Sequence, residues 1–147
     1  MAAEREAEVV WSGGLFDGSG QVSFLSSNFA KDVDVSWPAR TEVPEGKTSP
    51  EELIAAAHAS CFAMAFSKQL QDRGAETPEI RVHATSSFEK TDAGFRLTRM
   101  LLEARGKAPG IDAGAFNEAA EAAKIGCPVS NALAGNVQIE LKASFES

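Results

Sequence analysis

Two cysteines are the residues of this chain whose type and spacing suggest chemistry. Cys61 lies in the segment SPEELIAAAHASCFAM and Cys127 in the segment IGCPVS. Two cysteines cannot staple a domain of this size, and in a reducing compartment such a pair is more often catalytic, redox-active or simply buried than structural. Thiol chemistry is therefore the first functional hypothesis.

A nucleophilic Cys61 would need a positive charge nearby. A free thiol has a pKa of about 8.5 and burial raises it, so a cation must stabilise the thiolate at neutral pH. Arg40 suits this role because arginine stays charged when desolvated, and Glu51 could hold its guanidinium in a bidentate pair. In the alternative interpretation, Cys61 is a small core hydrophobe, Arg40 a surface residue and Glu51 a solvated charge at a helix N-terminus.

Cys127 has the opposite local setting. It occupies a predicted N-cap position and is followed by Pro128 at the first helical position. A helix N-terminus lowers the pKa of a thiol without any cation, and an N-cap is often accessible to solvent. Local physics alone makes Cys127 the more reactive of the two thiols.

The two histidines have ordinary interpretations. His58 lies one turn before Cys61, and we expect a core histidine bonded to a carbonyl rather than a catalytic base. His83 fits an ordinary strand position. Two histidines and two cysteines at these spacings do not match a zinc site, and no phosphate-binding glycine loop follows a strand. We expect no metal and no cofactor.

Composition and charge narrow the class of protein. The chain has 147 residues, of which 44% are hydrophobic and 24% charged, and this predicts one folded domain over 1–147 with a flexible tail at 1–7. A net charge of -7 disfavours a nucleic-acid partner. No apolar run reaches the roughly 18 residues of a membrane span, and the N-terminus lacks a signal-peptide pattern. We expect a cytoplasmic protein with no membrane partner.

Strand and helix patterns come in groups rather than in regular alternation, which predicts an α+β fold with antiparallel sheets around a central helix. The expected elements, in chain order, are a hairpin over 9–26, a third strand over 32–37, the central helix from 50, a second hairpin over 79–105, a helix over 112–126, a shorter one over 127–135 and a closing strand over 137–145. The second hairpin changes its apolar face near residue 100, which fits either a bulge or a strand buried on both sides.

The central helix poses a geometric problem. Ser49, Pro50 and Glu52 form a predicted capping box, with the Glu52 carboxylate reaching back to the cap amide. The stretch 53–66 is apolar on every face and should be buried on all sides. Ten residues of helix place Glu51 about 15 Å from Cys61, too far to share one arginine. Either the helix breaks, or two chains pair.

The sequence resembles the osmotically inducible and organic hydroperoxide resistance proteins, the OsmC/Ohr family. The matching segments are TSPEELIAAAHASCFAMAFS and GCPVSNAL, supported by DAGFRLTRM and PGIDAGAF, and the match covers nearly all of the chain. The motifs AAHASCF and GCPVS are closer to the OsmC branch than to Ohr. Members form intertwined homodimers, so the resemblance implies that fold and a homodimer here.

The resemblance also implies a thiol-dependent peroxidase of the oxidative and osmotic stress response. Cys61 matches the peroxidatic cysteine and Cys127 the resolving one, which reverses the ranking from local physics. Arg40 matches the active-site arginine and Glu51 its carboxylate partner. The implied partners are an organic hydroperoxide substrate and a dithiol reductant, of lipoyl type or another thiol.

Two other functions fit parts of the pattern. One is a non-catalytic dimer that binds a lipid or another apolar ligand, with both cysteines in the core. The other takes CPVS as a thioredoxin-like redox motif in which Cys127 attacks first, although no strand directly precedes it and the βαβ context is missing.

Overall fold

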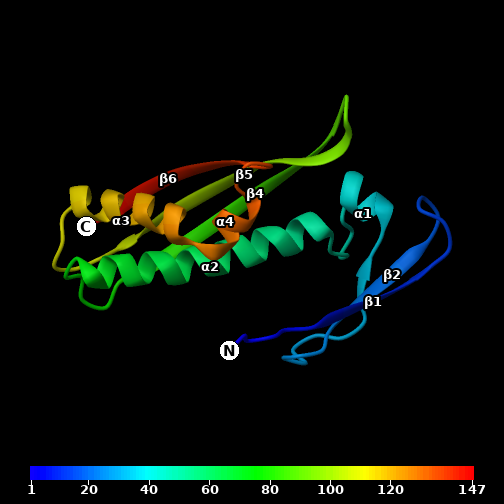
Figure 1. Ribbon diagram of the computed structural model, residues 1–147, viewed down its shortest axis with the longest axis horizontal. Helices are drawn as coiled ribbons and strands as arrows, with labels where there is room; N and C mark the ends of the chain where they lie inside the picture. The colour runs from blue at the N-terminus through cyan, green and yellow to red at the C-terminus, as the bar shows by residue number, and fades with distance from the viewer. The chain divides into compact units, whose positions relative to one another are not determined.

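The computed structural model describes all residues from 1 to 147. They divide into two compact units, 1–53 and 54–147, and each is described by itself. The elements in chain order (Figure 1) are β1 (Ala7–Ser12), β2 (Ser19–Phe24), β3 (Val33–Val35), α1 (Trp37–Thr41), α2 (Pro50–Asp72), β4 (Glu79–Thr91), β5 (Gly94–Lys107), α3 (Ala113–Gly126), α4 (Pro128–Leu133) and β6 (Gln138–Glu146). The α+β class is confirmed.

The first unit is a small antiparallel sheet followed by a short helix. Strands β1, β2 and β3 pair in sequence order, as the hairpin pattern and the third apolar run predicted. Gly13 has a φ of 94°, a left-handed conformation that glycine adopts without steric cost in the β1–β2 turn. Ser36 then caps α1, because its hydroxyl accepts from the Ala39 amide at 3.2 Å.

Helix α2 begins with the predicted cap and runs without a break. The Ser49 hydroxyl accepts from the Glu52 amide at 3.2 Å. The Glu52 carboxylate, however, accepts from the Thr48 hydroxyl at 2.6 Å instead of reaching the Ser49 amide, so only half of the capping box is present. The Thr48 hydroxyl competes with the Ser49 amide as donor to the Glu52 carboxylate, and the capping-box pattern takes no account of such a neighbour.

Helix α2 is buried along one side only. His58, Phe62, Phe66 and Leu70 are fully buried and recur every four residues, which places them in one row. Met64 on another side is 73% exposed. The prediction that residues 53–66 are buried on all sides is therefore wrong within the single chain. The segment has apolar residues around the whole circumference of the helix, and the rest of this chain covers only one side of it.

The second unit contains a three-stranded sheet of mixed direction. Strands β4 and β5 form the predicted antiparallel hairpin, and the register shifts where Ser87 faces Arg99 but Phe88 faces Leu97. Thr98 is thus the extra residue of a bulge, which decides between the two interpretations of the face change. Strand β6 pairs with β5 in parallel, so the expectation of purely antiparallel sheets is wrong at this strand.

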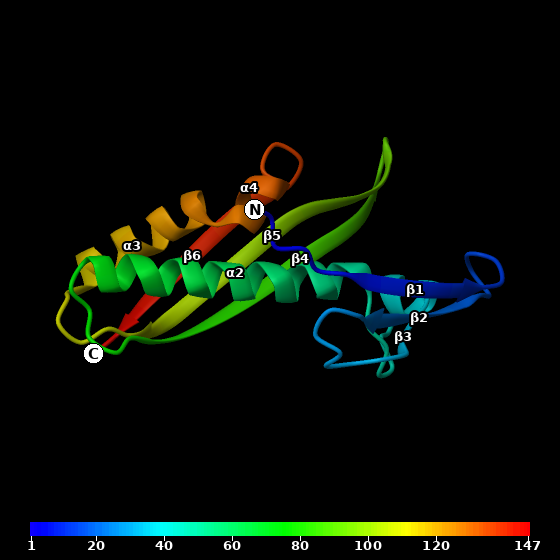
Figure 2. The ribbon, with the colours of Figure 1, turned by 60° about the horizontal axis from the view of Figure 1, so that its bottom comes forward.

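Helices α2 and α3 cover one face of this sheet (Figures 1 and 2). Asp112 caps α3 by accepting from the Ala115 amide at 2.8 Å, and the predicted apolar stripe of the helix is fully buried. Phe116 joins the layers, because its ring centroid lies 5.0 Å from that of Phe66 on α2 and 5.2 Å from that of Phe145 on β6. None of the helices is long and apolar enough to span a lipid bilayer.

Truncation of Phe116 to alanine should destabilise the protein by about 3–5 kcal/mol, because it leaves a cavity between two helices and the sheet. The free energy of unfolding from denaturant titration measures this loss. Asn117→Ala, at the exposed neighbouring position, is the matched control and should change it by less than about 0.5 kcal/mol. Equal losses in the two variants would contradict this description of the core.

Candidate active site

The two thiols lie together in the unit 54–147. Cys61 comes from the middle of α2 and Cys127 from the N-cap of α4, and the two thiols lie close enough for each to influence the pKa of the other. Both cysteines are reduced. Cys61 is half-buried, whereas Cys127 is fully buried, so the accessibility expected for an N-cap thiol is wrong here. The packing of α2 against the start of α4 accounts for the burial.

The surroundings of Cys127 favour its thiolate. Burial by itself raises the pKa of this thiol, but the Ser130 amide, the Cys61 thiol, the Ser130 hydroxyl and the Val129 amide together bring the pKa below its ordinary value. The side chain makes no capping hydrogen bond as a thiol. The amides at the start of α4 still stabilise the anion, as the N-cap argument predicted.

Cys61 is affected in the opposite direction. Burial raises the pKa of this thiol, the Val129 amide lowers it, and the nearby Cys127 thiol raises it again. None of these influences is a positive charge. Within its own unit, Cys61 therefore has the environment of a protonated thiol, and ionisation depends on a positive charge brought to it.

A buried histidine and serine lie beside the thiol pair. His58 Nε2 is 2.8 Å from the Ser130 hydroxyl oxygen, and the two residues are 0% and 3% exposed. The expected carbonyl partner of His58 is therefore wrong, since the partner is a side chain 72 positions further along. Sequence reasoning missed Ser130, although its place three residues after the N-cap Cys127 was a signal.

Arg40 and Glu51 form an ion pair in the unit 1–53. The Arg40 Nε atom lies 2.5 Å from one Glu51 carboxylate oxygen and 3.2 Å from the other. One nitrogen thus contacts both carboxylate oxygens. Glu51 is 8% exposed, so it is no solvated surface charge. The guanidinium carbon also lies 5.9 Å from the centroid of the Trp37 ring.

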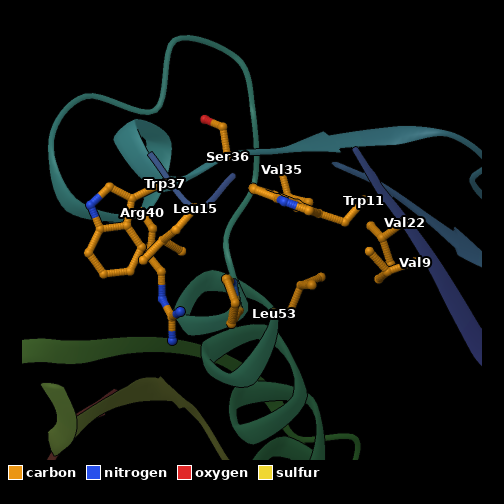
Figure 3. A pocket seen from close by; sticks show the side chains of 10 residues that line it. Val9, Trp11, Leu15, Val22, Val35, Ser36, Trp37, Arg40 and Leu53 are labelled. Atoms are coloured by element: carbon orange, nitrogen blue, oxygen red, sulfur yellow. The ribbon is translucent and has the colours of Figure 1, made fainter. Parts of the chain in front are cut away.

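A pocket that the sequence did not indicate adjoins this ion pair. Its volume is about 320 Å³. Figure 3 shows apolar side chains of the first unit gathered around it, with Arg40 among them. The lining residues are Val9, Trp11, Leu15, Val22, Val35, Ser36, Trp37, Arg40, Pro50 and Leu53. The pocket combines one cation with apolar walls, which suits a small molecule with one polar end.

The four predicted site residues thus form two pairs. Arg40 lies with Glu51 in the first unit, and Cys61 lies with Cys127 in the second. Helix α2 connects the units without interruption from Pro50 to Asp72, so the alternative of a broken helix is wrong. Its length still separates Glu51 from Cys61 by about 15 Å of axial rise.

Mild oxidation of the reduced protein with diamide should produce an internal disulfide between Cys61 and Cys127, because the two thiols are neighbours that influence each other's pKa. Loss of both free thiols in unfolded, non-reduced protein, with peptide mapping of the bridge, measures this reaction. Cys127→Ser is the control and should form no internal bridge. Two thiols that persist after oxidation would contradict the observed contact.

Comparison with known proteins identifies the family. Residues 43–142 match the family model described as OsmC-like protein. Peroxiredoxin OsmC of Escherichia coli is 37% identical over 95% of this chain and 96% of its own length. The organic hydroperoxide resistance protein of Xanthomonas axonopodis is 30% identical over 80% of this chain and 82% of its own length.

The fold agrees with these matches. The crystal structure of the organic hydroperoxide resistance protein OhrB of Bacillus subtilis superposes with a TM-score of 0.70 at 24% identity, over 94% of this chain and 97% of that one. The family match and the 37% identity to OsmC together establish that the chain belongs to the OsmC-like protein family, as its cysteine motifs predicted.

Proposed function

We propose that this protein is a thiol-dependent peroxidase that reduces organic hydroperoxides to alcohols, with Cys61 as the attacking thiol and Cys127 as the resolving one. The observation that carries the proposal is the contact between the two thiols, one half-exposed and one buried. The names of the relatives, peroxiredoxin and organic hydroperoxide resistance protein, support the reaction class and a role in the stress response.

The first step is a displacement at oxygen. The Cys61 thiolate attacks the peroxide oxygen that carries hydrogen, a sulfur–oxygen bond forms, and the oxygen–oxygen bond breaks. The alkoxide leaves and takes up a proton, which gives the alcohol. Cys61 is oxidised to a sulfenic acid and the peroxide is reduced.

Arg40 supplies the charge that the neutral surroundings of Cys61 lack. Its guanidinium stabilises both the thiolate and the negative charge that develops on the peroxide oxygens, while Glu51 keeps it oriented. The apolar pocket beside Arg40 would hold the organic part of the substrate. This lining favours organic hydroperoxides over hydrogen peroxide, which has no apolar part to bury.

The second step uses the more acidic thiol. The Cys127 thiolate attacks the Cys61 sulfenic acid, a disulfide forms and water leaves. A dithiol reductant, of lipoyl type or another thiol, then attacks the Cys61 sulfur, which is the exposed one of the pair. Cys127 leaves in this step, and its lowered pKa makes it the better leaving group. A reducing cytoplasm would supply this reductant.

A homodimer would bring the two pairs of residues together. The exposed side of α2 carries Ala56, Ala57, Ser60 and Met64, a nearly apolar surface suited to burial against a second copy. Because the unbroken helix holds Glu51 far from Cys61 of its own chain, we assign Arg40 of the partner subunit to each Cys61.

Cys61→Ser should abolish consumption of an organic hydroperoxide such as cumene hydroperoxide in the presence of a dithiol, because no peroxidatic sulfur remains. Cys127→Ser should reduce about one equivalent of peroxide per site and then stop, or continue only slowly, because resolution is lost. Peroxide consumption over time measures both. Undiminished turnover by Cys61→Ser would refute the proposal, and two unchanged thiols after peroxide would favour a non-catalytic binder of apolar ligands.

Mixed dimers test the assignment of Arg40 to the partner's cysteine. Arg40→Ala should lower the rate by roughly 10²–10³ and Cys61→Ser should abolish it. Chains of the two variants, unfolded together and refolded, should recover about a quarter of the wild-type rate, since half of the dimers are mixed and each has one complete site. The matched charge control repeats the mixing experiment with Arg105→Ala in place of Arg40→Ala. Arg105 lies at an exposed strand position. No recovery, or a monomer by light scattering, would overturn the assignment.

A further inference from the structure

His58 is a buried polar side chain with half of its hydrogen-bonding capacity unused. It is 0% exposed, its Nε2 atom lies 2.8 Å from the Ser130 hydroxyl oxygen, and its Nδ1 atom has no hydrogen-bond partner. A buried polar atom without a partner costs free energy, and an apolar residue could fill the same space. The ring therefore calls for an explanation beyond packing.

The protonation state of His58 follows from its surroundings. Burial lowers the pKa of this imidazole, so the ring is neutral at physiological pH and carries one N–H. Placed on Nδ1, that N–H would be a buried donor with no acceptor. Placed on Nε2, it donates to Ser130 and leaves only a lone pair unused. The second tautomer keeps the donor satisfied.

This tautomer determines what Ser130 can do. The serine hydroxyl has a single proton and two neighbours that can accept it, the His58 ring at 2.8 Å and the sulfur of Cys127, which lies at the N-cap three residues before Ser130. If Nε2 donates to the hydroxyl oxygen, the hydroxyl proton cannot be used on the ring and is available to the sulfur. His58 and Ser130 then form a chain of two donors that ends at the Cys127 sulfur, which accepts.

We propose that neutral His58 is a positioning residue, which donates from Nε2 to Ser130 and thereby aims the serine hydroxyl proton at the Cys127 sulfur, stabilising the thiolate that captures oxidised Cys61. The resolving role of Cys127 rests on the proposed function. The stabilisation of its thiolate does not, and can be measured without any peroxide.

The proton balance of the resolving step requires no transfer through this chain. The Cys127 thiolate forms the sulfur–sulfur bond, the sulfur–oxygen bond of the Cys61 sulfenic acid breaks, and the departing hydroxide takes up the proton that Cys127 released on ionising. Cys61 sulfur is reduced as Cys127 sulfur is oxidised. Ser130 and His58 keep their own protons throughout.

The chain offers a direct readout of the Cys127 thiolate. In the Cys61→Ser background Cys127 is the single cysteine, and the protein contains no tyrosine, so ultraviolet absorbance against pH follows this thiolate without interference from phenolate. No alkylating reagent has to reach the buried sulfur. Cys61 is the titratable side chain that acts on Cys127, the other influences being neutral amides and a hydroxyl, and the background removes it from all variants alike.

In this background Ser130→Ala should lower the thiolate fraction at neutral pH by a factor on the order of ten, the size of a hydrogen bond to a charged group. His58→Leu should lower it in the same way, since the serine proton is then no longer directed. His58→Gln should retain the parent titration, because its amide N–H can replace Nε2. Asn131→Ala, at the exposed position next to Ser130, is the matched control.

Circular dichroism verifies that each variant is folded. An unchanged titration in Ser130→Ala would overturn the proposal even if His58→Leu fails to fold. A titration of His58→Gln shifted as far as that of Ser130→Ala would also overturn it, since the ring would then act as a base and not as a donor.

A second experiment uses the protein with both cysteines. After one equivalent of organic peroxide, Ser130→Ala should accumulate a Cys61 sulfenic acid, trapped by dimedone, because disulfide closure is slowed. If disulfide closure in Ser130→Ala is as fast as in the wild type, the proposed role in resolution is wrong. If the wild type consumes no organic peroxide, the proposed peroxidase function fails, and the absorbance titration still decides the role of His58.

Discussion

The contact between helix α2 and the first turn of α4 sets the chemistry of this protein, because it brings two thiols together in unequal surroundings. Cys127 lies against the amides that begin α4, which favour its anion, whereas Cys61 lies on the flank of a helix among neutral groups. Adjacent thiols do not ionise independently, since the first negative charge opposes the second. When the pair holds one proton, the fold therefore favours that proton on Cys61. A cation from outside the pair would be needed to stabilise the Cys61 thiolate instead.

The other half of the site follows from this asymmetry. A half-exposed thiol with a raised pKa is inert at rest, and its activation depends on a guanidinium held by a carboxylate. The thiol pair and the Arg40–Glu51 ion pair come from different units of the chain.

Sequence reasoning succeeded where the controlling interaction was local. The position of Cys127 at the start of α4 depends on neighbouring residues, and it was predicted. Sequence reasoning failed where the residue that determines the interaction lies far away along the chain. Alternating side chains are the same in parallel and antiparallel strands, so the direction of β6 had no local signal. The partner of His58 lies 72 positions away, and the apolar surface of α2 does not reveal which molecule covers it.

The parallel pairing of β6 with β5 has a consequence for how the molecule is built. Cys127 is carried in the crossover from 108 to 137 that joins these two strands, while Cys61 precedes the hairpin of β4 and β5. Pairing of β4 with β5 closes a short loop. Pairing of β6 with β5 closes the long crossover, and the closure of long loops is slow. The two thiols therefore come from segments on opposite sides of the β4–β5 hairpin in the sequence, and they become neighbours only when the crossover packs against α2.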